Sequence, residues 1–205
     1  VGQSVEREGA GETNGGESMS MQLLAGVVGV GIFIVIVIFF YNRFVRRRYA
    51  VRSAWADIDV HLKKRYDLVP GLVEVVKGYA AHESATLTKV ADVRTAAMKA
   101  SGPGEKSRTE NMLTETLKSL FALAEAYPAL KADAHFQTLM TQLREIEDNI
   151  EYARRYYNAA VLNYNVAIGV FPANLVASAF SFGPEVFFEL GESKEAREPV
   201  KVTFK

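Results

Sequence analysis

The chain has 205 residues with 24 basic and 24 acidic side chains, so its formal net charge is zero. A charge balance this even excludes a dedicated nucleic-acid binder, because binding to phosphate depends on an excess of Lys and Arg. The chain contains no cysteine, which excludes disulfides, thiolate nucleophiles and cysteine metal sites.

The first forty residues predict a tail and a membrane anchor. Residues 1–20 are rich in Gly, Glu and Ser, and we expect them to be disordered. Residues 23–40, LLAGVVGVGIFIVIVIFF, lack any charged side chain. Extended to residues 21–41, they form a helix that can cross a hydrocarbon layer about 30 Å thick. A cleaved signal peptide is the alternative, but the preceding stretch is acidic and no small-x-small cleavage pattern follows the run.

Basic residues predict the orientation of this single-pass anchor. Five arginines follow the apolar run closely, whereas one, Arg7, precedes it. Because Lys and Arg accumulate on the cytoplasmic side of a span, we expect the N-terminus outside the cell and the C-terminal domain in the cytoplasm, with the anchor in the cell (inner) membrane. The same arginines attract anionic membrane lipid, by about 1 kcal/mol each. They are Arg43, Arg46, Arg47, Arg48 and Arg52.

Residues 42–182 predict one all-α domain. In residues 43–100, apolar side chains recur at mostly three- and four-residue steps, the spacing of a helix that buries one face in a bundle. Pro70-Gly71 interrupts this segment, because proline removes a backbone donor and glycine costs about 1 kcal/mol in a helix interior. A kink and a full break both remain open. We expect Trp55 to be buried between the first and third helices of the bundle.

Two further helices are predicted after a stop at Ser101-Gly102-Pro103-Gly104. Ser107 and Glu110 have the capping-box spacing of a second helix, which runs to about residue 126. Asp133 can cap a third helix. Its apolar positions are Phe136, Leu139, Leu143, Ile146, Ile150, Ala153, Tyr157, Val161, Tyr164 and Ile168.

The C-terminal part carries weaker signals. Residues 173–180 can form one or two more helical turns, and residues 183–205 are predicted to be a tail. The alternation in residues 200–204 is typical of a short strand. Together the patterns predict an N-terminal transmembrane helix followed by a cytoplasmic bundle of long antiparallel helices.

Two long segments resemble the signatures of a known family. Residues 54–83, AWADIDVHLKKRYDLVPGLVEVVKGYAAHE, resemble the first signature of the LemA family of bacterial membrane proteins. Residues 146–177, IEDNIEYARRYYNAAVLNYNVAIGVFPANLVA, resemble the second. The resemblance extends from the anchor to about Phe182, and His61 stands where the family usually has glutamine. It implies a membrane anchor and a helical cytoplasmic bundle, but no established enzymatic activity, cofactor or substrate.

The histidines do not form a metal motif. His82-Glu83 begins an HExxH zinc pattern, but Thr86 stands in place of the second histidine. A di-iron bundle needs paired Glu-x-x-His motifs, and no histidine of the chain has a glutamate three residues earlier. We therefore predict no metal site and no cofactor.

The carboxylates likewise predict no catalytic residue. Asp57 and Asp59 are two residues apart and cannot share a helix face, whereas Asp59 and Lys63 have the spacing of a surface ion pair. A hydrolase with paired carboxylates would need a cleft, and nothing in the sequence indicates one. The prediction is therefore a protein without enzymatic activity.

Tyrosines and asparagines are unusually dense in the predicted third helix. Tyr157 and Tyr164 lie on its apolar face, where each hydroxyl needs a hydrogen-bond partner once it is buried. One interpretation is a hydrogen-bonded lock between helices. The other is a groove for a peptide or partner protein, because tyrosine and arginine dominate contact sites between proteins.

These observations predict a non-catalytic scaffold or assembly protein at the inner face of the membrane. The alternative is an adaptor that presents clients to a membrane enzyme such as a protease. If the first helix continues through Pro70, three helix directions place residues 171–190 far from the bilayer, where their aromatic side chains predict contacts within a homo-oligomer. If the chain turns back at Pro70, the same aromatics lie at the membrane surface. Membrane lipid and another membrane protein are the other predicted partners.

Overall fold

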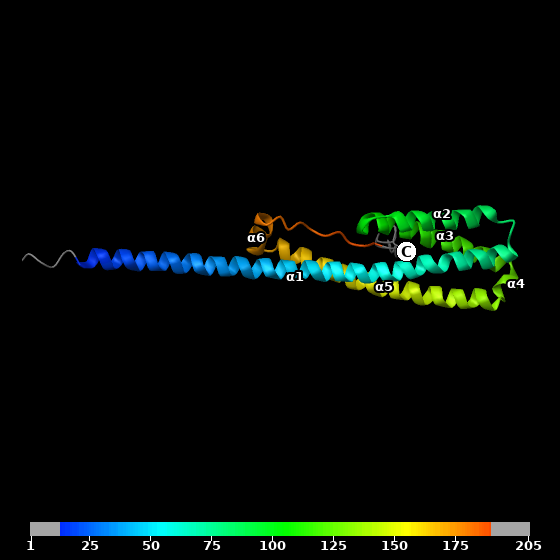
Figure 1. The fold of residues 1–205 in the computed structure, drawn as a ribbon, viewed down its shortest axis with the longest axis horizontal. Coiled ribbons are helices and arrows are strands. Elements are labelled where there is room, and N and C mark those ends of the chain that lie inside the picture. The colour runs from blue at the N-terminus through cyan, green and yellow to red at the C-terminus, as the bar shows by residue number, and fades with distance from the viewer. Residues whose placement is uncertain (1–12, 190–205) are drawn as a thin grey trace, which may run out of the picture.

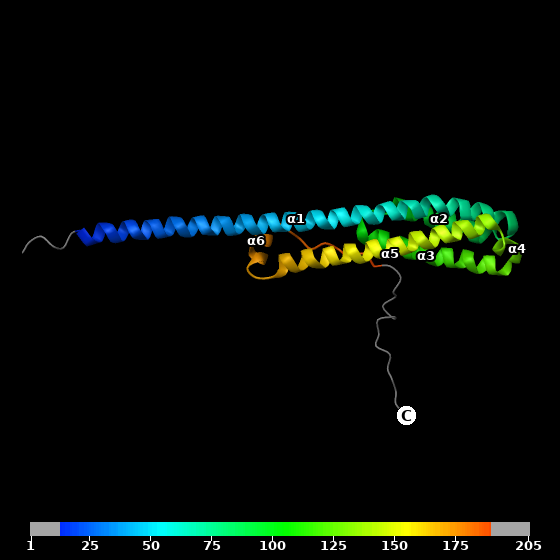
Figure 2. The same cartoon turned by 90° about the horizontal axis from the view of Figure 1, so that it is seen from below.

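The computed structural model describes residues 13–189, and the described chain is helical up to residue 179 apart from short connections. Four long helices pack side by side and antiparallel, and the N-terminal half of the first extends alone beyond them (Figures 1 and 2). The predicted all-α architecture is confirmed. The helices are α1 (Thr13–Tyr79), α2 (Ser84–Lys99), α3 (Gly102–Ala126), α4 (Pro128–Lys131), α5 (Ala134–Gly169) and α6 (Ala173–Ala179).

Helix α1 joins the apolar run to the bundle without interruption. It contains 67 residues, so it is about 100 Å long. Residues 13–20, which the sequence assigns to the tail, are helical, and the rest of that predicted tail lies outside the described residues. The side chains of the apolar run are exposed, as expected where lipid would surround them, and this part of α1 is long and apolar enough to cross a membrane.

Pro70 lies inside α1 and does not break it. Proline has no N–H to donate to the main-chain oxygen of Tyr66, four residues earlier. The guanidinium of Arg94 on α2 takes that place, because its Nε donates to the Tyr66 oxygen at 2.6 Å. The carbonyl that proline leaves unpaired is therefore satisfied from the neighbouring helix, which allows α1 to continue.

The predicted helical segment over residues 43–100 is instead divided at residues 80–83, so a break at Pro70-Gly71 is wrong and the chain turns ten residues later. The Glu83 N–H donates to the Ala80 oxygen at 3.1 Å and closes a tight turn. Ala80 is buried in this turn, and α2 then returns toward the apolar run of α1. Residues 80–83 contain no Gly or Pro, but Gly78 lies in the last turn of α1 directly before them.

Helix α3 begins earlier than the capping pattern predicted. The Ser101 N–H donates to Glu105 Oε2 at 2.9 Å, and Gly102 has a φ of +74°, a conformation that glycine adopts without strain. Ser107 is thus inside the helix, and Glu110 is fully buried rather than capping an end. The predicted end of this helix near residue 126 is confirmed.

Helices α5 and α6 agree with their predictions. Asp133 caps α5, because its Oδ1 accepts the Phe136 N–H at 2.9 Å, and this bond lowers the pKa of Asp133. Helix α6 follows Pro172 as expected. The predicted strand at residues 200–204 lies outside the described residues.

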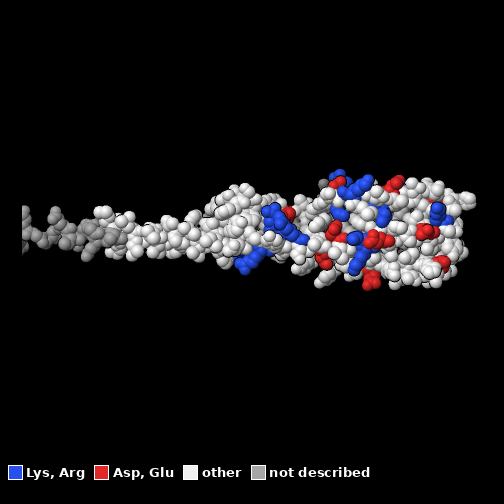
Figure 3. Space-filling view, viewed as in Figure 1, with Lys and Arg blue, Asp and Glu red and all other residues white. Residues whose placement is uncertain are grey.

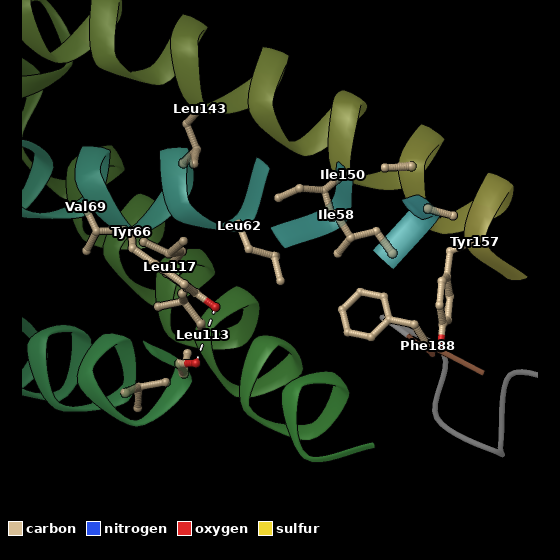
Figure 4. Close-up of a cluster of buried hydrophobic side chains, with 14 of the residues drawn as sticks. Ile58, Leu62, Tyr66, Val69, Leu113, Leu117, Leu143, Ile150, Tyr157 and Phe188 are labelled. Atoms are coloured by element: carbon tan, nitrogen blue, oxygen red, sulfur yellow. Dashed lines mark hydrogen bonds between the residues drawn. The ribbon is translucent and has the colours of Figure 1, made fainter. Parts of the chain in front are cut away.

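The core runs along the inside of the bundle (Figure 4). Its side chains come from apolar positions that the periodicity identified and that lie on α1, α2, α3 and α5. Trp55 lies between α1 and α5, with its ring 5.3 Å from that of Tyr157, but it is only partly buried. Fully or almost fully buried members include Ile58, Leu62, Val69, Leu113, Leu117, Leu143 and Ile150.

The extra turn at residues 80–83 reverses the expected position of the C-terminal aromatics. Helix α1 leaves the apolar run, α2 returns, α3 leaves again and α5 returns (Figure 1). The ring of Phe180 therefore lies 5.2 Å from that of Tyr41, and Phe182 lies 5.4 Å from Phe44. Of the two predicted positions, the one far from the anchor is wrong; the aromatics lie beside the end of the apolar run, because the chain turns back at residues 80–83 and not at Pro70.

Candidate peptide-binding site

An extended segment, residues 183–189, runs along α5 toward the bundle (Figure 1). The α5 face beneath it carries two asparagines seven residues apart, Asn158 and Asn165, and two tyrosines with the same spacing, Tyr157 and Tyr164. Seven residues of helix rise about 10.5 Å, and three residues of extended chain cover about 10 Å. We call these four side chains the α5 ladder.

The two asparagines bind the main chain of the segment in the same way. Asn165 accepts the Glu185 N–H and donates to the Glu185 oxygen, both at 2.9 Å. Asn158 repeats this pair of bonds with Phe188, both at 3.0 Å. Each side-chain amide thus makes the two hydrogen bonds that a hydrogen-bonded residue of a neighbouring antiparallel strand would make. Such recognition depends on backbone shape, not on the side chains at these positions.

The tyrosines bind the main chain of the same segment at two other positions, one between Glu185 and Phe188 and one before Glu185. The Tyr164 hydroxyl donates to the Gly183 oxygen at 3.0 Å, and the Tyr157 hydroxyl donates to the Val186 oxygen at 2.7 Å. Burial raises the pKa of both hydroxyls, that of Tyr157 to about 12. The expectation that each hydroxyl finds a partner is confirmed, but the partner is an extended segment instead of another helix.

Side-chain contacts fix the position of the segment along the ladder. Phe188 is fully buried beside Tyr157 (Figure 4), with its ring 5.4 Å from that of Trp55. The Glu185 carboxylate lies 3.2 Å from Nε of Arg48 on α1. Beside the backbone-directed bonds, the ladder therefore holds one large apolar side chain and one acid, three residues apart.

A second polar cluster lies largely inside the bundle. Arg65 and Glu110 are both fully buried, with Arg65 Nη1 3.2 Å from Glu110 Oε2, and Arg65 Nε is 3.1 Å from Glu147 Oε1. The Tyr66 hydroxyl also donates to Glu110, whose pKa is raised by burial although Tyr66 and Arg65 act in the opposite direction. Because Arg65 is paired with a carboxylate on each of two neighbouring helices, this cluster joins α1, α3 and α5, with Arg65 and Glu110 buried and the Glu147 carboxylate 38% exposed.

The remaining sequence candidates are scattered. Asp59 pairs with Lys106 of α3 at 3.5 Å, so the predicted pairing with Lys63 is wrong. Asp57 lies 3.9 Å from His61 one turn along α1, and His82 is exposed in the turn before α2. Among the described residues, no group of three or more His, Asp or Glu side chains is arranged to hold a metal ion.

Comparison with known proteins identifies a family and several relatives of the chain. The model of the LemA family matches residues 54–204. The chain belongs to the LemA family. Magnetosome protein MamQ 2 of Paramagnetospirillum magneticum is 25% identical to this LemA-family chain, and the alignment covers 82% of the chain and 71% of the relative. Protein LemA of Metamycoplasma hominis is 24% identical, with 83% and 78% of the two proteins covered. With the exposed apolar run of α1, this membership makes the chain a membrane protein of LemA type.

The α5 ladder was only partly visible in the sequence of this LemA-family chain. The density of tyrosine and amide side chains marks α5, and the repeated Tyr-Asn pair at seven-residue spacing is the signal that identifies the ladder. The segment that it binds begins only 18 residues after the second pair. No local pattern links the two, because the contact is made through main-chain atoms.

Proposed function

We propose that the protein is a non-catalytic scaffold or assembly protein, anchored in the inner membrane by residues 21–41 and with its bundle in the cytoplasm. In this proposal the α5 ladder is the binding surface, and it binds polypeptide segments in an extended conformation. The observation that carries this proposal is the paired bonding of Asn158 and Asn165 to two main-chain positions. Main-chain hydrogen bonds supply affinity, and pockets for alternate side chains supply specificity, as in other modes of strand capture.

The first partner of the ladder in this proposal is a second copy of the chain. Residues 183–189 of one copy fit the ladder of another with the same contacts that they make within one chain, which is the basis of domain swapping. Anchoring in one membrane raises the local concentration of copies and favours such exchange. A homo-oligomer held by exchanged segments follows.

Light scattering on the full-length protein in detergent tests this proposal. We expect a particle larger than a monomer, and a shift toward monomer when Asn158→Ala and Asn165→Ala are combined. The matched control is Asn163→Ala, which changes an exposed asparagine of the same helix. A monomeric wild-type protein, or an oligomer that the double variant leaves intact, contradicts the proposal.

The second candidate function is an adaptor that presents clients to a membrane enzyme such as a protease. The backbone-directed bonding of the ladder favours it, since client segments of many sequences could replace residues 183–189. Co-purification of the full-length protein with one enzyme in fixed stoichiometry would support the adaptor over the scaffold. Loss of that co-purification in the Asn158→Ala, Asn165→Ala variant would assign the contact with the enzyme to the ladder.

The orientation has its own test. Lys63 and Lys64 lie beyond the anchor on α1 and are exposed. With the bundle in the cytoplasm, an amine reagent that cannot cross membranes should label these lysines only after cells are lysed. Equal labelling in intact cells would place the bundle outside.

A further inference from the structure

The bend between α5 and α6 lies in a part of the chain without any charge. Between Arg155 and Glu185, 29 consecutive residues include no Asp, Glu, Lys or Arg. The two helices meet at 94°. At this elbow, residues 169–180, large apolar side chains face outward, with Phe171 79%, Leu175 62% and Phe180 51% exposed. Soluble surfaces seldom present such a contiguous apolar patch.

The elbow lies level with the end of the apolar run. Arg47 of α1 donates to the main-chain oxygen of Asn163 on α5. This bond places Arg47 and Asn163 at the same height along the antiparallel helices α1 and α5. Both helices rise by the same distance per residue, so Gly169, six residues after Asn163, lies at the height of Tyr41, six residues before Arg47. The ring contact between Tyr41 and Phe180, at 5.2 Å, agrees with this level.

The surface view shows the same continuity. In Figure 3 the part of the molecule around the elbow is white and merges with the white anchor, and blue side chains lie at its lower edge and farther toward the bundle. Figures 1 and 2 place α6 beside α1 at this point. A helix that meets α5 at 94° lies near the plane of the membrane when α5 stands close to the membrane normal.

We propose that the elbow of residues 169–180 is a second membrane contact, which places Phe171, Leu175 and Phe180 among the lipids of the leaflet next to the anchor. The occupant of this patch is lipid because the anchor holds the elbow at the boundary of the hydrocarbon layer. Apolar side chains at such a boundary bury themselves about 5 to 10 Å into the headgroup and acyl region. The contact also holds α5, and with it the α5 ladder, at a fixed distance from the bilayer.

Site-directed labelling of the full-length chain tests this proposal, and the absence of native cysteine makes single labels possible. Phe171→Cys and Leu175→Cys change exposed side chains and should not disturb folding. An environment-sensitive fluorophore is attached at each position, and the protein is reconstituted in phosphatidylcholine and phosphatidylglycerol vesicles. Quenching is then measured with lipids that carry a nitroxide on the acyl chain and with iodide in the water.

Two controls bracket the result. Ile38→Cys lies in the apolar run, and Ala132→Cys lies at the opposite end of the bundle, after α4. Labels at positions 171 and 175 should resemble position 38, with strong quenching by nitroxide lipid and only a small part of the iodide quenching seen at position 132.

Two outcomes overturn the proposal. Iodide quenching at positions 171 and 175 equal to that at position 132 would show that the elbow is in water. Protection from iodide without quenching by nitroxide lipid would show that protein covers it.

Vesicles of phosphatidylcholine alone separate insertion of the elbow from attraction of the neighbouring arginines to anionic lipid. Because insertion depends on apolar side chains, quenching by nitroxide lipid at positions 171 and 175 should persist in these neutral vesicles. Its disappearance there would contradict insertion, since the elbow would then approach the membrane only through charge.

Discussion

The bond from Arg94 to the Tyr66 carbonyl gives the sharpest prediction about the fold. Arg94→Ala leaves that oxygen unpaired, because Pro70 cannot donate to it. A hydrogen bond from a charged donor contributes about 1.5 to 3 kcal/mol, and an orphaned buried acceptor costs about 1 to 3 kcal/mol. The bond is partly buried, so we expect the free energy of unfolding to fall by about 1 to 2 kcal/mol.

The cost of Arg94→Ala in the free energy of unfolding should depend on the residue at position 70. In Pro70→Ala, the new amide N–H can donate to the Tyr66 carbonyl within the helix, and the role of Arg94 becomes redundant. The cost of Arg94→Ala should then fall below about 0.5 kcal/mol, which gives a coupling energy of about 1 kcal/mol between the two positions.

Urea unfolding of the full-length protein in detergent measures this coupling. The single tryptophan, Trp55, lies in the bundle and reports its unfolding by fluorescence. Arg108→Ala, at an exposed position of α3, controls for the removal of one arginine. If Arg94→Ala costs the same in both backgrounds, the bond does not compensate for Pro70 and this account of the unbroken helix is wrong.

Three further predictions concern the core and the ladder. Burial raises the pKa of Glu110, so the folded state keeps the proton of this carboxyl group at pH values where the unfolded chain has released it. The free energy of unfolding should therefore fall as the pH rises above about 4.5. Urea unfolding at several pH values should show a weaker fall for Glu110→Gln. Trp55→Ala should cost about 3 kcal/mol, at the low end for this truncation because Trp55 is partly exposed, whereas Asp57→Asn should change the urea midpoint little. Tyr157→Phe should cost about 1 kcal/mol in the same assay, and Tyr156→Phe, at an exposed neighbouring position, should cost nothing measurable.

Helical periodicity predicted the parts of the fold that depend on burial along one face. The apolar positions of α3 and α5, the cap at Asp133 and the short helix after Pro172 all follow from local patterns. Two features did not follow from local patterns. Pro70 resembles a helix break until Arg94 satisfies the free carbonyl, and residues 80–83 resemble helix although the chain turns there.

The candidate site could likewise be predicted from local sequence patterns only in part. The apolar positions of Tyr157 and Tyr164 indicated that their hydroxyls needed partners, but the partners are main-chain oxygens of a segment with no periodicity of its own. Counting one helix too few also reversed the direction of α5, which moved the C-terminal aromatics from one end of the molecule to the other. A single missed turn therefore changed the predicted surroundings of an entire surface, although most of the helices were assigned correctly.

The unbroken course of α1 couples the thickness of the bilayer to the position of the bundle. Beyond Tyr41, α1 continues for 38 residues to Tyr79, a rigid arm about 57 Å long. Transmembrane helices adjust to thicker or thinner bilayers by tilting. A change in tilt of about 10° would move the far end of such an arm by about 10 Å. A small change in tilt would thus be amplified into a larger displacement of the surface around α4.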